Sequence, residues 1–126
     1  MKKGLLILLC LPMIGFGQNV NIPDANFKAY LVGNSAINTN GDAEIQVSEA
    51  SLFGNNPLTS STGTINCNNM NISDLTGIEA FTYLDFLNCS LNQLTSLDLS
   101  NNTALTDLTC QNNQLTSLDV STNTAL

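Results

Sequence analysis

The sequence predicts a β-rich repeat solenoid that is preceded by a small α-helical cap. Three observations support this fold class. Residues 84–104 and 105–125 are two copies of a 21-residue repeat in which every apolar position is matched. Uncharged Asn, Ser and Thr supply most polar positions of these copies, and they interrupt any helical period. The segment before the repeats differs in composition and contains two short amphipathic patterns.

Charge and composition exclude several classes of function. The 126 residues carry a formal charge of −7, with three Lys and Arg against ten Asp and Glu, and with no His. Binding to nucleic acid and to anionic membranes depends on basic residues, so we expect neither partner. Without His there are no Ser-His-Asp triads, Cys-His pairs or His-based metal sites, and no other acid, base and nucleophile are paired. We therefore predict that the chain is not an enzyme.

Residues 1–17 are predicted to be a signal peptide. A basic start precedes an apolar run over residues 5–14, and a small-x-small cleavage pattern ends at Gly17. Cleavage there would leave Lys28 as the one basic residue of a secreted or cell-surface chain that does not insert into the membrane. Two alternatives stay open: a transmembrane anchor, for which the run is short, and a lipoprotein acylated at Cys10.

The repeats share a leucine-rich signature. Each complete copy contains the pattern L-x-x-L-x-C-x-x-N-x-L, over residues 84–94 and 105–115. This pattern resembles the leucine-rich-repeat signature, including its allowed cysteine. A degenerate copy begins near Thr62; its residues 72–79 resemble the convex side of internalin-type repeats, and the later copies are similar to repeats of secreted bacterial leucine-rich-repeat proteins. The resemblance implies about three coils over residues 62–126.

Alternation along each predicted strand separates an inward face from an outward face. Leu87 and Cys89 are two positions apart, so both side chains point into a core that stacked coils share. The intervening side chains point outward, and among them Phe86 is the strongest candidate for a ligand contact, with partial burial by a neighbouring loop as the alternative. The outward positions of the three coils form the candidate ligand-binding surface: Asn66, Asn68, Phe86, Asn88, Ser90, Asp107, Thr109 and Gln111.

Asparagine is predicted to turn the chain at the end of each strand. Asn92 and Asn113 occupy the same repeat position, where their side chains would satisfy backbone groups left unpaired at the bend. The second half of each copy repeats the alternation at residues 97–99 and 118–120. We therefore expect short extended segments on both walls of the coils and little helix in the repeats.

Cysteine and aspartate also recur at fixed repeat positions. Cys67, Cys89 and Cys110 are predicted to stack as buried free thiols, because side chains in register lie farther apart than a relaxed disulfide prefers. A disulfide-bonded pair and a metal-binding or nucleophilic role are the alternatives. Asp98 and Asp119 are predicted to form an outward acidic row that is solvated, with weak cation binding as the alternative.

Residues 18–61 are predicted to form the cap of the solenoid. Asp24 precedes a short helix with an acidic N-terminus, and Ser48 is the predicted N-cap of a second short helix. A solenoid needs such a segment because its first coil has an apolar end. The side chains expected to cover that end are Phe27, Tyr30, Leu31, Ile45, Leu52 and Phe53.

A candidate calcium loop lies between the two predicted helices. Residues 38–49 follow the spacing of EF-hand and dockerin-type loops, which they resemble. Ala43 stands where such a loop has Gly, so we expect a weak site of millimolar affinity and no other cofactor. The alternative is a metal-free turn in which Asn and Asp side chains bind backbone amides. The candidate ligands are Asn38, Asn40, Asp42, Glu44 through its carbonyl, Gln46 and Glu49.

These features predict a non-enzymatic, adhesin-like extracellular binding module whose polar surface faces a protein or glycan partner. The alternative is a structural spacer or stalk of a larger cell-surface protein, with or without calcium in its cap. Leu126 aligns with the first position of a repeat, so we expect further repeats after it. Without them, Leu115, Leu118 and Val120 would face water, and the chain is predicted to self-associate through this end.

Overall fold

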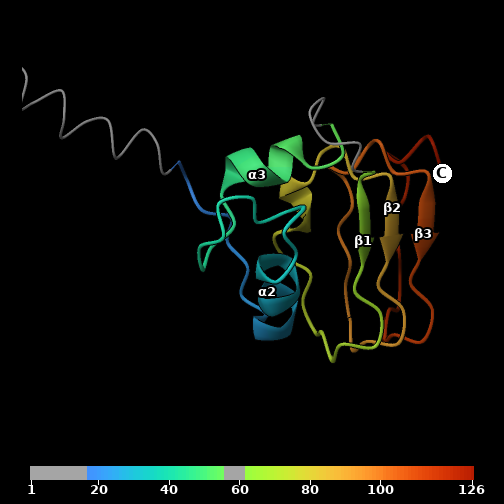
Figure 1. Ribbon diagram of the computed structural model, residues 1–126. Helices are drawn as coiled ribbons and strands as arrows, with labels where there is room; N and C mark the ends of the chain where they lie inside the picture. The colour runs from blue at the N-terminus through green and yellow to red at the C-terminus, as the bar shows by residue number, and fades with distance from the viewer. Residues whose placement is uncertain (1–16, 56–61) are drawn as a thin grey trace, which may run out of the picture.

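In the computed structural model, residues 17–55 and 62–126 are described, so the predicted signal peptide lies outside the described residues except for Gly17. The elements are helix α2 (Ala25–Val32), helix α3 (Val47–Leu52), strand β1 (Thr64–Asn66), the 3-10 turn η1 (Ile78–Ala80), strand β2 (Phe86–Asn88) and strand β3 (Asp107–Thr109). Figure 1 shows both helices on the β1 side of the strands and the C-terminus beside β3. We call residues 17–55 the N-terminal segment and residues 62–126 the repeat segment.

The three strands form one parallel sheet in the order β1-β2-β3. Each strand comes from a different repeat, and Leu87 of β2 pairs with Ile65 on one side and Leu108 on the other. The pairing continues past the strands, where the Cys89 N–H donates to the Thr109 carbonyl at 2.8 Å. Consecutive repeats therefore stack in register, because each buries the apolar side chains of its neighbour.

The core runs without interruption from the N-terminal segment into the repeats. Phe53 of the N-terminal segment meets Phe81 of the first repeat edge to face, with ring centroids 5.9 Å apart. Four of the six side chains predicted to cover the first repeat are buried: Phe27, Leu31, Ile45 and Phe53. Tyr30 is half-buried, and the prediction for Leu52 is wrong because this side chain is 52% exposed.

The two helices begin with different caps. The predicted start of α2 is confirmed, since Oδ1 of Asp24 accepts hydrogen bonds from the backbone N–H groups of Asn26 and Phe27. The predicted N-cap of α3 at Ser48 is wrong, because Gln46 occupies that position. The reason is Glu49, whose carboxylate reaches back to the Gln46 N–H at 3.1 Å and fixes the start of the helix two residues earlier.

The second half of each repeat lacks the strand that the first half contains. Residues 97–99 and 118–120, for which we expect extended segments, form no strand. Each of these segments is followed by a turn, at residues 100–101 and 121–122. There Oδ1 of Asp98 accepts the Ser100 N–H at 3.0 Å, and the Asn102 N–H donates to the Leu99 carbonyl at 3.0 Å. The sheet therefore consists of the first half of each repeat only, where β1, β2 and β3 pair with one another.

Polar contacts join the N-terminal segment to the first repeat. The hydroxyl of Tyr30 accepts the Asn66 N–H at 3.0 Å and so satisfies a backbone donor at the outer edge of β1. Oδ2 of Asp24 accepts the backbone N–H groups of Ser73 and Asp74 at 2.9 and 3.2 Å. Gly77, with φ of 109°, lies so close to Ile22 that an added Cβ would meet this side chain at 2.8 Å. Within the described ranges, no helix is long and apolar enough to cross a bilayer.

Candidate functional site

The side chains at the outward positions of the three strands lie side by side on one face of the sheet. Phe86 pairs with Asp107 across the β2–β3 boundary, and Asn88 pairs with both Asn66 and Thr109. Neighbouring strands in a sheet lie about 4.8 Å apart, so these side chains form one surface that a single ligand can span. Three of the predicted contact residues are exposed, namely Asn66, Asp107 and Gln111. Four are half-buried, namely Asn68, Phe86, Asn88 and Thr109.

Ser90 does not lie on this accessible surface as we predicted. Its side chain is 5% exposed, and its hydroxyl donates to Oδ1 of Asn88 at 2.7 Å. Asn68 and Gln111 hold the same position after β1 and β3 and are half-buried and exposed, so the burial of Ser90 is particular to its short side chain, which bonds back to Asn88. The chain begins to turn here, and the Ser90 carbonyl accepts the Asn69 N–H of the preceding repeat at 3.0 Å.

Asparagine side chains satisfy backbone groups at the end of each strand, as predicted, and they also connect neighbouring repeats, which we did not predict. Nδ2 of Asn92 donates to the carbonyls of Cys67 and Cys89, at 2.9 and 3.0 Å. Oδ1 of the same residue accepts the N–H groups of Met70 and Ile72, both at 3.0 Å. Asn113 repeats most of this arrangement one repeat later: its Nδ2 donates to the carbonyls of Cys89 and Cys110, and its Oδ1 accepts the Leu94 N–H. Each amide therefore satisfies buried backbone groups of two repeats at once.

A second asparagine column, which our sequence analysis did not include, lies at the opposite turn. Nδ2 of Asn102 donates to the carbonyls of Ile78 and Phe81, at 2.8 and 3.0 Å. Asn123 repeats the pattern with the carbonyls of Leu99 and Asn102, both at 2.9 Å. Both amides are buried. Their recurrence at one repeat position is the sequence signal that identifies them.

Three free cysteines stack directly after the three strands. Cys67 and Cys89 are fully buried, and Cys110 is half-buried. Burial raises the pKa of the Cys67 thiol and of the Cys89 thiol to about 12. A thiolate is the nucleophilic form, so these two positions are unsuited to nucleophilic chemistry. The free-thiol interpretation agrees with the structure.

The acidic row on the second wall is exposed. Hydrogen bonds from the backbone and side chain of Ser100 lower the pKa of Asp98, and those from Ser121 do the same for Asp119. A shallow groove of about 240 Å³ runs between them and is otherwise lined mainly by Ser and Thr. Both carboxylates thus stay charged and solvated, as expected for an outward row.

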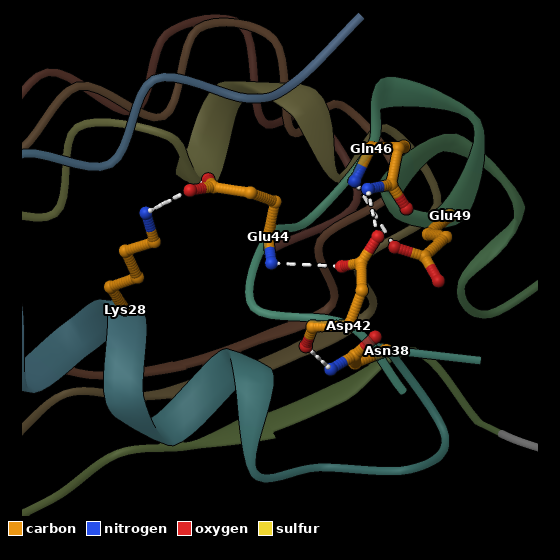
Figure 2. Close-up of polar contacts among 6 residues, drawn as sticks. All are labelled: Lys28, Asn38, Asp42, Glu44, Gln46 and Glu49. Carbon is orange, nitrogen blue, oxygen red and sulfur yellow. Dashed lines mark hydrogen bonds and ion pairs between the residues drawn. The ribbon is translucent and has the colours of Figure 1, made fainter. Parts of the chain in front are cut away.

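The predicted calcium loop is closed by hydrogen bonds between its own residues (Figure 2). Oδ1 of Asp42 accepts the Glu44 N–H at 2.8 Å, and Oδ2 accepts Nε2 of Gln46 at 3.0 Å. Oε1 of Glu49 accepts the Thr39 N–H at 2.8 Å, and Oε2 accepts the Gln46 N–H. Oδ1 of Asn38 accepts the Gly41 N–H, and Oδ1 of Asn40 accepts the Asp42 N–H. Protein donors therefore occupy the side-chain oxygens that we predicted as ligands.

The third carboxylate of the loop points away from the other two. Glu44 forms an ion pair with Lys28 of α2, with Nζ and Oε2 2.8 Å apart, as Figure 2 shows. Among residues 17–55 and 62–126, no three Cys, Asp or Glu side chains gather in a way that could hold a metal ion. Hydrogen bonds of this kind are expected of a metal-free turn, but they do not test calcium binding, which stays a prediction.

Comparisons with known proteins relate the chain to internalins. No known family profile matches it. The chain is 51% identical over 39 residues to internalin J of Listeria monocytogenes serotype 4b (strain F2365), a match that covers 31% of this chain and 4% of that protein. The functional domain of InlJ from Listeria monocytogenes, which includes a cysteine ladder, superposes with a TM-score of 0.68 at 37% identity. This superposition covers 87% of the chain and 23% of that domain.

A second solved structure supports the same fold. An internalin (inlF) from Listeria monocytogenes strain 4b F2365 superposes with a TM-score of 0.67 at 23% identity, over 83% of this chain and 28% of that one. At this identity the similarity shows the fold alone, which is the leucine-rich-repeat fold that we predicted. The chain spans only a small part of the proteins that it matches. The chain is therefore similar to internalins over these regions, in sequence to internalin J and in fold to the InlJ and inlF structures.

Proposed function

We propose that the chain is a non-enzymatic extracellular recognition module whose strand face binds a protein or glycan. The observation that carries this proposal is the register of the sheet, which joins Asn66, Asn88 and Thr109 in one row across three repeats. Phe86 lies beside this row as a half-buried aromatic side chain. Surfaces built by stacked repeats suit extended ligands, because each repeat adds a similar set of contacts.

The proposal also covers the parts of the chain around the strand face. Residues 18–61 would cap a solenoid formed by residues 62–126, which is supported by the shared core and by the contacts of Asp24 and Tyr30 with the first repeat. Residues 1–17 would direct export and be removed, so the module would act outside the cell or on its surface. Mass spectrometry of the exported protein tests this, with Gln18 expected as the first residue.

Binding by Phe86→Ala and Asn88→Ala variants tests the recognition surface. We expect each variant to lose affinity for ligands selected with the wild-type chain from a printed glycan array and a random-peptide phage library. Ser96→Ala serves as the control, because Ser96 is exposed but does not belong to any of the three strands. Affinities that stay unchanged in both strand-face variants would contradict the proposal.

The second candidate function is a structural spacer of a larger cell-surface protein. It is favoured by the two asparagine columns, which hold neighbouring repeats together at both turns. A spacer needs rigidity and no ligand, so it predicts no selective binding by the wild-type chain on either library. The same experiment therefore separates the two functions.

A further inference from the structure

We infer that two copies of the chain bind each other through the open edge of β3, as a twofold-symmetric dimer in which the two β3 strands run antiparallel. Strand β3 lies at one edge of the sheet, and no strand beyond it is found among the described residues. The dimer does not depend on which ligand the strand face binds. It goes beyond the function proposed above, because it would join the strand faces of two copies into one continuous surface.

The backbone of β3 presents hydrogen-bonding groups along this open edge. The Thr109 carbonyl accepts the Cys89 N–H at 2.8 Å, so the backbone groups of Thr109 face β2. Successive residues of a strand direct these groups to opposite sides, so those of Leu108 and Cys110 face away from β2. An edge of this kind is a template for pairing with another chain.

These edge groups are self-complementary when the twofold axis passes through Thr109. Leu108 of one copy then lies opposite Cys110 of the other, and each such pair exchanges two N–H···O bonds. Asp107 lies opposite Gln111 of the second copy. Like charges directly opposite each other destabilise a strand pair, and this register avoids them on β3 although the chain carries a net charge of −7. The edge therefore fits a second copy of itself.

The apolar side chains beside this edge lack the cover that those of the preceding repeat have. Leu94 and Leu99 are fully buried, whereas their equivalents Leu115 and Val120 are half-buried and 38% exposed. A groove of about 400 Å³ lies at this end, and its apolar lining consists of Cys110, Leu115 and Leu118. The same twofold axis sets the two ends against each other, so each copy covers the apolar side chains of the other.

The N-terminal segment excludes the other arrangement, in which β3 of one copy would pair with β1 of the next. The outer edge of β1 is already occupied, since the hydroxyl of Tyr30 accepts the Asn66 N–H at 3.0 Å. Phe53 packs on Phe81 at the same end, and Figure 1 shows both helices on that side of the strands. With one end covered and the other open, the contact closes as a dimer and does not extend into a filament.

Cysteine crosslinking tests this interface. Residues directly opposite at the non-hydrogen-bonded positions of an antiparallel pair have Cα atoms about 4.5 Å apart, which a disulfide can span. Under mild oxidation, Thr109→Cys should therefore give about tenfold more disulfide-linked dimer than Asn88→Cys, the matched control at the paired position of the central strand. Asp107→Cys and Gln111→Cys should each stay unlinked alone and should link to each other when mixed. Mass spectrometry of the linked peptides separates these products from any link through Cys110.

Sedimentation of the wild-type chain at micromolar concentration should show a dimer. A monomer would overturn the inference, and so would longer oligomers, because a closed twofold contact cannot form them. Equal linking of Thr109→Cys and Asn88→Cys, or no link between Asp107→Cys and Gln111→Cys, would overturn the antiparallel register. None of these measurements uses a ligand, so their failure would be distinct from a failure of the proposed function.

Discussion

Asp24 shows how one carboxylate does two structural tasks. One oxygen accepts the first N–H groups of α2, and the other accepts the backbone and side-chain donors of Ser73 and the N–H of Asp74. Partial burial raises the pKa of Asp24, but the hydrogen bonds from Phe27, Ser73 and Asp74 together outweigh it and lower the pKa. The residue thus helps to fasten the N-terminal segment to the repeats.

We predict that Asp24→Asn lowers the free energy of unfolding by about 1–2 kcal/mol. Asparagine retains an acceptor for the helix, but its Nδ2 would face the donors of Ser73. The folded-state pKa lies below the unfolded value of about 4, so the ionised group stabilises the fold at neutral pH, and this contribution is lost as the pH falls through 4 and below. Urea unfolding across this range measures the effect. Asp107→Asn should change little, and equal pH profiles for wild type and Asp24→Asn would contradict the argument.

The three cysteines should react at different rates. At pH 8 we expect iodoacetamide to label Cys110 in the folded chain, because it is half-buried, and to spare Cys67 and Cys89. Their pKa of about 12 keeps the thiols protonated, and burial excludes the reagent. Peptide mapping after labelling gives the modified residue. Labelling of all three in urea is the control, and fast reaction of Cys89 without denaturant would refute this assignment.

Among the structural elements, the asparagine columns add hydrogen bonds between the repeats. We predict that Asn92→Ala lowers the free energy of unfolding by about 3 kcal/mol, since it leaves buried backbone groups of two repeats without partners. Asn113→Ala should cost less, because Asn113 is half-buried and lies in the last repeat of the chain. Denaturant melts of both variants give the comparison. A smaller loss for Asn92→Ala than for Asn113→Ala would contradict it.

The loop between α2 and α3 should bind calcium no more tightly than the millimolar range. Its side-chain oxygens already accept hydrogen bonds from Thr39, Asn40, Gly41, Asp42, Glu44 and Gln46, so a cation would have to break these bonds. Calorimetric titration of wild type measures the affinity, with Asp42→Asn as the control that removes one anionic ligand. A micromolar dissociation constant that is lost in Asp42→Asn would instead establish a true calcium site.

For the whole molecule, we expect the exposed apolar side chains beyond β3 to promote self-association. Leu118 and Val120 are each 38% exposed, and Leu115 is half-buried. Exposed apolar clusters drive self-contact, so we predict that the 126-residue chain forms oligomers at micromolar concentration. The double variant Leu118→Asn and Val120→Thr should shift the sedimentation profile toward monomer. A monodisperse wild-type monomer would disprove this prediction.

Most of the repeat architecture could be predicted without coordinates, but part of the candidate site could not. The inward placement of Leu87 and Cys89 follows from period and position alone, and so does the bonding of Asn92 to backbone groups at the bend. The burial of Ser90 could not be predicted this way, because Asn68 and Gln111 hold the same repeat position and are not buried. The positive φ of Leu91, 56°, could not be predicted either, because leucine rarely adopts this conformation.

The sequence by itself determined the repeat period, the core-facing positions and the residues of the strand face other than Ser90. It could do so because one repeat cannot bury its own apolar side chains, so a matched copy must stack on it. The tertiary structure decided how the N-terminal segment is attached and how its loop is closed. Asp24 meets Ser73 across 49 positions, and Glu49 reaches Thr39 across ten. Such contacts depend on the packing of distant segments, which local pattern does not specify.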